Sequence, residues 1–224
     1  MNGCCGPGSK LKGADIVLAG NPNVGKSVLI NQLTGVGAIV SNYPGTTVEI
    51  LEGESRFKGK SFRVADLPGI YSLRGVSDDE KVAVKYLDSA QPKVIIDVID
   101  ATKLERNLFL TLQLLRLETP LIVALNFYDE AENSGIRIDP TKLSTRLGVP
   151  VIPINALTGA GVDILVKQSF ATFKNKRDFG GLDTEEQLHD MASKIAKNAT
   201  AGAEKRKPRF SDWLDKLTTT PLIA

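Results

Sequence analysis

One glycine-rich run, residues 20–27, constrains the fold of this chain more than any other feature. It reads Gly-Asn-Pro-Asn-Val-Gly-Lys-Ser, and it lies between an apolar run that predicts a strand and a pattern that predicts a helix. The glycines let successive backbone N–H groups turn inward around a phosphate, and the start of a helix adds the positive end of its dipole. The run therefore predicts a phosphate-binding loop, in which Lys26 reaches the β and γ phosphates and Ser27 binds Mg²⁺.

Around this loop, short β-branched runs alternate with helical patterns, which is typical of βαβ units and a mostly parallel α/β sheet. The connection Lys58-Gly59-Lys60 predicts a hairpin, which would place one antiparallel edge strand on the sheet. The leucines at 104, 108, 112 and 115 recur at helical spacing and predict a helix that packs on the core. We expect six strands, at residues 15–19, 48–55, 61–65, 93–99, 120–125 and 151–154.

The chain has 224 residues, enough for one sizeable core with a small appendage. The alternation stops after residue 173, so we expect a flexible tail over residues 1–12, the α/β domain over residues 13–173 and a reduced helical annex over residues 174–224.

The annex carries its own helix signals. Asp183 and Glu186 predict a capping box, and the apolar positions 188, 191, 195 and 199 predict the helix that follows it. A second short helix is expected at residues 211–217. The basic run at residues 205–209 fits either a solvated loop or a charge cluster close to a following membrane span.

Composition excludes several classes of function. The chain has 28 basic and 26 acidic residues, a formal charge of +2, so no overall field attracts nucleic acid or an anionic bilayer. The two cysteines, Cys4 and Cys5, are adjacent and cannot close a loop across the core, and they favour an inert tail in a reducing compartment over a metal site. The longest apolar runs are far shorter than the ~20 residues that a spanning helix needs.

A second motif, Asp66-Leu67-Pro68-Gly69, follows the third predicted strand. Ligands of open α/β sheets bind at the carboxyl ends of the strands, so Asp66 is placed to reach Mg²⁺ through water. Gly69 leaves its backbone N–H free to meet a γ-phosphate, whose loss would release the loop that follows. The stretch between the two motifs leaves room for a mobile loop with Thr46 and Thr47, one of which should close over the metal.

A third motif, Asn126-Phe127-Tyr128-Asp129, selects the base. Asp129 can accept hydrogen bonds from two guanine nitrogens together, whereas adenine offers no matching donor pair and would leave the carboxylate unpaired. Guanine is therefore favoured. Asn155 and Ala156 follow the last predicted strand, where a backbone N–H could meet guanine O6.

These motifs and their neighbours resemble the N-terminal cytosolic GTP-binding (G) domain of the ferrous iron transport protein B (FeoB) family. The resemblance covers residues 15–173 and continues in the ending Phe210-Ser211-Asp212-Trp213-Leu214-Asp215-Lys216-Leu217. It implies a Ras-like P-loop GTPase fold. It also implies that Thr47, which precedes Val48-Glu49, is the switch threonine, and that Asn23 holds K⁺ together with carbonyls of the loop at residues 42–45.

The resemblance and the motifs together define the candidate site. We assign catalysis to Lys26, Asn23, Thr47 and Gly69. Ser27, Thr47 and Asp66 are assigned to Mg²⁺, and Asn23 to K⁺, with an amide that only bonds within the loop as the alternative. The expected contacts of GTP or GDP are Asn21, Pro22, Asn23, Val24, Gly25, Lys26, Ser27, Val28, Thr46, Thr47, Asp66, Gly69, Asn126, Phe127, Asp129, Asn155, Ala156 and Leu157.

The function that this resemblance implies is a nucleotide switch with slow GTP hydrolysis that regulates Fe(II) uptake. Ile70, the residue after Gly69, is apolar and cannot orient water as the glutamine of Ras-like proteins does. The implied partners are guanine nucleotide and a membrane domain of the same protein, at the cytoplasmic face of the inner membrane, with no nucleic acid and an open oligomeric state.

Two other functions compete with this one. A free-standing Era-like GTPase acting on RNA or ribosome assembly would usually carry a basic and aromatic binding domain, and the annex has only three such aromatic residues, Phe179, Phe210 and Trp213, and one short basic run. A scaffold with an inactive phosphate loop would lack Lys26, Ser27 or Asp66, and all three are present.

Overall fold

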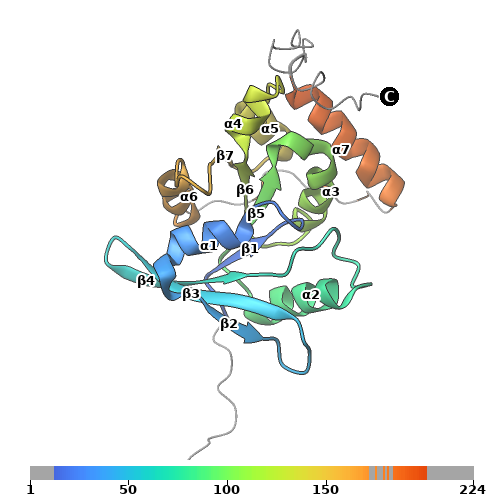
Figure 1. Ribbon diagram of the computed structural model, residues 1–224. Coiled ribbons are helices and arrows are strands. Elements are labelled where there is room, and N and C mark those ends of the chain that lie inside the picture. Colours follow the sequence, from blue (N-terminus) through green and yellow to red (C-terminus); the bar gives the residue numbers. More distant parts are fainter. Residues whose placement is uncertain (1–12, 172–174, 176–178, 180, 182–183, 201–224) are drawn as a thin grey trace, which may run out of the picture.

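The computed structural model of this chain describes residues 13–171, 175, 179, 181 and 184–200. Its centre is a sheet of seven strands in the order β2-β3-β4-β1-β5-β6-β7 (Figure 1). The strands are β1 (Ile16–Ala19), β2 (Ile39–Asn42), β3 (Glu49–Phe57), β4 (Lys60–Asp66), β5 (Val94–Asp100), β6 (Leu121–Asn126) and β7 (Val151–Pro153).

Five of the strands are parallel, and the expected antiparallel edge is confirmed. Parallel pairing joins β4, β1, β5, β6 and β7, in that order. In contrast, β3 pairs antiparallel with β4 and with β2. Lys58 and Gly59 join β3 to β4 with φ values of 49° and 78°, the left-handed conformation that a tight hairpin turn requires.

The sheet has one strand more than the six expected. The additional strand is β2, which lies outside β3 at the edge of the sheet. Every residue of β2 is exposed, so no alternation of buried and exposed positions marks it as a strand in the sequence. The structure thus shows a paired hairpin where the sequence predicts a mobile loop.

Helices cover both faces of the sheet (Figure 1). α1 and α6 pack on one face through Leu29, Ile30 and Leu165, and α2, α3, α5 and α7 contribute to the core of the other face. The four leucines predicted to face the core from residues 104–115 are all buried. The helices are α1 (Lys26–Thr34), α2 (Asp78–Ala90), α3 (Leu104–Leu114), α4 (Tyr128–Asn133), α5 (Pro140–Leu147), α6 (Val162–Ser169) and α7 (Glu185–Ala199), with short 3₁₀ turns at Gly35–Gly37 and Ala101–Lys103.

The expected annex helix is α7, but its capping box is not the one predicted. Thr184 is the N-cap and exchanges hydrogen bonds with Gln187, so the box lies one residue after Asp183 and Glu186. This register places Leu188, Ile195 and Ala199 in the core, as the sequence predicts, with Met191 only partly buried. The second helix expected at residues 211–217 lies outside the described residues.

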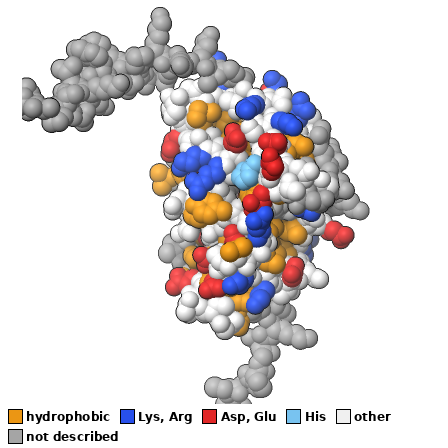
Figure 2. Space-filling model, turned by 90° about the vertical axis from the view of Figure 1, so that its right-hand side faces the viewer, with side chains coloured by type: hydrophobic (Ala, Val, Ile, Leu, Met, Phe, Trp, Pro, Cys, Tyr) orange, Lys and Arg blue, Asp and Glu red, His pale blue; other side chains and the backbone are white. Residues whose placement is uncertain are grey.

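α7 is packed along α3 on the outer surface of the molecule. The ring of His189 stacks on Phe109 of α3 with centroids 4.2 Å apart, although the histidine itself remains exposed. Figure 2 shows this single histidine of the chain at the surface among acidic and basic side chains. Among the described residues, no helix combines the length and the apolar composition needed to cross a bilayer.

Candidate functional site

The loop between β1 and α1 has the backbone conformation expected of a phosphate cradle. Gly20, Asn23 and Gly25 all have positive φ, at 145°, 63° and 94°. At Gly25 a Cβ atom would lie 2.4 Å from Nδ2 of Asn126, so only glycine fits there. The chain turns sharply enough at these positions to aim backbone N–H groups into the loop.

Lys26, the first residue of α1, lies inside this loop. Its ammonium donates to the carbonyl oxygens of Gly20 and Asn21, both at 3.2 Å. Burial lowers the pKa of Lys26, and the nearby carboxylates Asp66 and Asp97 oppose that shift. A buried ammonium whose hydrogen bonds within the described part of the chain go to two neutral carbonyls is well placed to exchange them for anionic phosphate oxygens.

Ser27 and Asp66 meet beside Lys26, as the motifs predict. The hydroxyl of Ser27 donates to Oδ2 of Asp66 at 3.1 Å. Burial raises the pKa of Asp66 to about 6, while Lys26 and the bond from Ser27 hold it down. The second oxygen, Oδ1, is buried without a hydrogen-bond partner among the described residues. A hydroxyl beside a carboxylate with a free oxygen is a hard-oxygen pair of the kind that Mg²⁺ prefers, so these residues fit that ion.

The segment after Asp66 is held against the phosphate loop. Ile70 donates its backbone N–H to the carbonyl of Gly20 at 3.2 Å, and Ile70 itself is buried. A Cβ atom on Gly69 would lie 2.8 Å from Cα of Pro22, so the close approach of these two segments requires glycine. Gly69 is therefore in place next to the loop.

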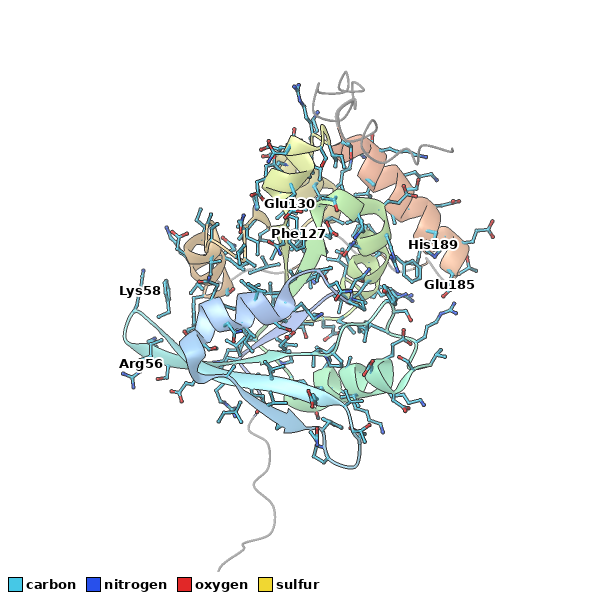
Figure 3. The ribbon with its side chains drawn as sticks, viewed as in Figure 1. Arg56, Lys58, Phe127, Glu130, Glu185 and His189 are labelled. Carbon is cyan, nitrogen blue, oxygen red and sulfur yellow. The ribbon has the colours of Figure 1, made fainter. Side chains whose placement is uncertain are left out.

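Further along, the same segment is attached to two helices. Leu73 donates its N–H to Oε1 of Gln113 on α3 at 2.6 Å. Arg74 forms a 2.8 Å ion pair with Glu185, at the first residue of α7. Figure 3 shows Glu185 and His189 on α7 beside α3. Sequence patterns did not indicate either contact.

At the other end of the site, Asn126 connects three loops. Its Nδ2 donates to the carbonyl of Val24 at 2.9 Å, and its Oδ1 accepts from the backbone N–H of Ala156 at 3.0 Å. Phe127 follows with a left-handed φ of 57° and lies between β6 and α4 (Figure 3). This arrangement fixes the phosphate loop relative to the two segments predicted to contact the base.

Asp129 and Asn155 also come together. Nδ2 of Asn155 donates to Oδ2 of Asp129 at 2.9 Å, and Oδ1 of Asn155 accepts from the N–H groups of Leu157 and Thr158. The side chain of Asn155 therefore orients Asp129 and closes the turn after β7. The N–H of Ala156, the group expected near guanine O6, is bonded to Asn126 in this structure.

The loop with the switch threonines is not brought to the metal ligands. Thr46 closes the β2–β3 turn by donating from its N–H and its hydroxyl to the carbonyl of Tyr43, both at 3.0 Å. Thr47 is exposed and makes no hydrogen bond to any described residue. The ring of Tyr43 contacts Tyr86 of α2, which holds the turn on the α2 side of the sheet (Figure 1).

Asn23 is exposed in the loop, and Val28 is exposed in the first turn of α1. The Asn23 side chain is exposed, and none of the described residues forms a hydrogen bond with it. Its oxygen is free to bind a cation. The loop carbonyls expected to share that cation lie in the β2–β3 turn.

Asp97 is a buried charged residue that the sequence patterns missed. It lies within the apolar run of β5, is fully buried, and has one oxygen with no partner among the described residues. Its signal in the sequence is a carboxylate between the apolar residues 94–96 and 98–99 of β5.

Comparison with known proteins places these features in a family. The family profile described as "Ferrous iron transport protein B" matches residues 14–169. The "Fe(2+) transporter FeoB" of Salmonella typhimurium is 48% identical over 159 residues, which are 69% of this chain and 21% of that protein. The matched part thus spans about a fifth of that relative.

Two solved structures show the same fold. The cytosolic domain of T. maritima FeoB in its GMPPNP form has a TM-score of 0.74 and 27% identity, covering 84% of this chain and 99% of that one. An S. thermophilus NFeoB mutant bound to mGDP has a TM-score of 0.66 and 46% identity, covering 70% of this chain and 60% of that one. The Ras-like α/β fold predicted from the sequence is confirmed. The chain belongs to the ferrous iron transport protein B family.

Proposed function

We propose that this chain is a GTP-binding, slowly GTP-hydrolysing domain that regulates Fe(II) uptake by a membrane transporter of which it is a part. The observation that carries this proposal is the position of Asn126, which ties the phosphate loop at Val24 to the base-reading segments at Asp129 and Ala156. The names of the relatives support the guanine nucleotide and the iron transporter.

The hydrolysis that we propose transfers the γ-phosphoryl group of GTP to water and yields GDP and phosphate. Lys26 binds the β and γ phosphates, and the N–H of Gly69 meets the γ-phosphate. Mg²⁺, held by Ser27, Asp66 and Thr47, would supply neutralising charge on the phosphate oxygens. Thr47 must leave its exposed place in the β2–β3 turn to join them. Ile70 is buried and apolar, so no side chain at this position orients water, and hydrolysis is slow.

Isothermal titration of the purified domain tests the binding proposal. We expect GDP and GTP to bind in the presence of Mg²⁺ and ATP to bind roughly four orders of magnitude more weakly, because Asp129 finds no donor pair on adenine. Comparable affinities for ATP and GTP would contradict the proposal.

Asn23 leads to a separate prediction, about potassium. Its free, neutral amide oxygen suits a monovalent cation, which would offset charge that develops between the β and γ phosphates. We expect GTP turnover to rise roughly severalfold when KCl replaces NaCl at equal ionic strength. Phosphate release measured in the two salts checks this.

The matched variant is Asn23→Ala, which should remove the difference between the salts and leave GDP affinity nearly unchanged. Equal turnover of the unsubstituted domain in KCl and NaCl would rule out the potassium site without touching the GTPase proposal.

We further propose the division of the chain into a G domain over residues 13–173 and an annex over residues 174–224. The relatives' length supports a membrane domain in the same protein, which would place this chain at the cytoplasmic face of the inner membrane. The Era-like alternative receives no support from the family or the relatives compared.

A further inference from the structure

The proposed mechanism leaves one buried acidic residue of the central strand without a role. Asp97 lies in the middle of β5, beside Ala19 of β1 and Val123 of β6, and is 0% exposed. Ala19 directly precedes the phosphate loop, so the carboxyl group lies beneath that loop. Burying a charged carboxylate is costly unless it is paired, so its protonation state matters.

The contacts of Asp97 allow it to hold or release a proton. The hydroxyl of Thr111 on α3 lies 2.5 Å from Oδ2 of Asp97 and 3.3 Å from the carbonyl of Asn107. It can donate to an ionised Asp97, or it can accept from a protonated Asp97 and donate to Asn107. Oδ1 has no hydrogen-bond partner among the described residues. Both protonation states therefore fit without rearrangement.

The cation near Asp97 is the ammonium of Lys26, which donates to the carbonyl of Gly20, the residue that follows Ala19, the neighbour of Asp97 on β1. Burial raises the pKa of Asp97 to about 7, and the bond from Thr111 and the charge of Lys26 limit the rise. The neighbouring positions on β1 and β6 are apolar, and α3 contributes an uncharged threonine. Asp66 is the other carboxylate near Lys26, Asp100 ends β5, and α7 brings the exposed His189 to the far side of α3.

We propose that Asp97 balances the charge of Lys26 in the empty phosphate loop and takes up a proton when the phosphates of a nucleotide bind there. The proposal rests on the nucleotide binding proposed above. Phosphates that pair with Lys26 add negative charge near Asp97 and offset the positive charge of Lys26, which stabilises the ionised form of Asp97. Asp66, in contrast, would then face Mg²⁺. Asp97 acts through Lys26 and is a positioning residue, not a catalytic one.

The direction of the pH dependence follows from this. Bound phosphate raises the pKa of Asp97 above its value of about 7 in the empty loop. Nucleotide affinity is therefore greatest below that pH, and it falls as the pH rises from the lower pKa to the higher one. Each unit of pKa difference corresponds to about a tenfold change in affinity.

Calorimetric titration with GDP tests the proposal, using the complete chain at pH 6.0, 7.0 and 8.5 in EDTA so that Mg²⁺ does not contribute. Asp66, whose pKa is raised to about 6, titrates in the unsubstituted protein and in Asp97→Asn alike, so the difference between the two proteins reports on Asp97. Between the extremes we expect the unsubstituted protein to lose about tenfold more affinity than Asp97→Asn. Titration at pH 7.5 in buffers with different ionisation enthalpies should show proton uptake on binding, and Asp97→Asn should show less.

Two further variants keep the test decisive. Asp88→Asn makes the same chemical change at an exposed position of α2 and should behave like the unsubstituted protein. Thr111→Val removes the hydrogen bond that stabilises the ionised form of Asp97, so the pKa of Asp97 should rise. The fall in GDP affinity should therefore move to higher pH. This shift can be measured even if Asp97→Asn does not fold. The inference would be overturned if Asp97→Asn showed the same pH dependence of GDP affinity and the same proton uptake as the unsubstituted protein. It would also be overturned if the affinity of Thr111→Val fell over the same pH range as that of the unsubstituted protein. Failure of the unsubstituted chain to bind GDP at any pH would instead overturn the proposed function.

Discussion

Replacing Asp129 by Asn is expected to lower GDP affinity by roughly three to four orders of magnitude and to improve binding of xanthosine diphosphate. In the proposed site the carboxylate would accept hydrogen bonds from two donors of guanine, whereas an amide would place its own NH₂ against one of them. Xanthine carries a carbonyl in place of the exocyclic amine, so it accepts from that NH₂. In the structure Asp129 is already oriented by Asn155 at 2.9 Å, so little ordering remains to be done on binding.

Equilibrium titration with GDP and xanthosine diphosphate measures this exchange of specificity. Glu130→Gln is the matched control, because Glu130 is the next residue of α4 and an exposed acid (Figure 3). It should leave both affinities almost unchanged. If Asp129→Asn kept its preference for GDP, the base would be read elsewhere in the site.

The second large effect is expected at Lys26. Lys26→Ala should weaken GTP binding by at least about 100-fold, because it removes a buried charged donor to the phosphates. The domain should still fold. Asp66 and Asp97 lose their shared cation, but burial already raises the pKa of Asp66 to about 6 and that of Asp97 to about 7, so both can become neutral.

Titration with GTP, together with a thermal melt at pH 6 and pH 8, checks both parts of this prediction. The melt of Lys26→Ala should be more pH-dependent than that of the unsubstituted protein. The sign follows from burial, since a carboxyl group with a raised pKa favours the folded state at low pH and disfavours it as the pH rises. Lys85→Ala, on the exposed face of α2, is the control. Near-normal GTP affinity in Lys26→Ala would refute the assigned role.

Most of the fold could be predicted from the sequence because its signals are local. The phosphate loop, the Lys58-Gly59 hairpin and the leucine stripe of α3 are each specified within about a dozen residues. β2 could not be predicted, because all four of its residues are exposed and only pairing with β3 defines it. The capping box was misplaced by one residue because Asp183 and Thr184 are both good N-caps, and only packing distinguishes them.

The candidate site was predictable to a similar extent. The contact between Ser27 and Asp66 follows from the rule that the carboxyl ends of parallel strands meet at one edge. The bond from Asn155 to Asp129 joins residues 26 positions apart, and no local pattern indicates it. Asp97 and Thr111 are partners only because α3 packs over β5, which neither segment reveals alone.

The contacts of Leu73 and Arg74 have a thermodynamic consequence. They attach the segment that follows Gly69 to Gln113 of α3 and to Glu185 of α7. If bound nucleotide changes these contacts, it changes the affinity of α7 for any partner that binds this helix. Coupling between two binding events is reciprocal, so such a partner must change nucleotide affinity by the same factor. The Arg74–Glu185 pair has side chains 53% and 42% exposed, so its own share is small, at most about 1 kcal/mol. A transporter attached beyond α7 would then act as an effector of this domain as much as its target.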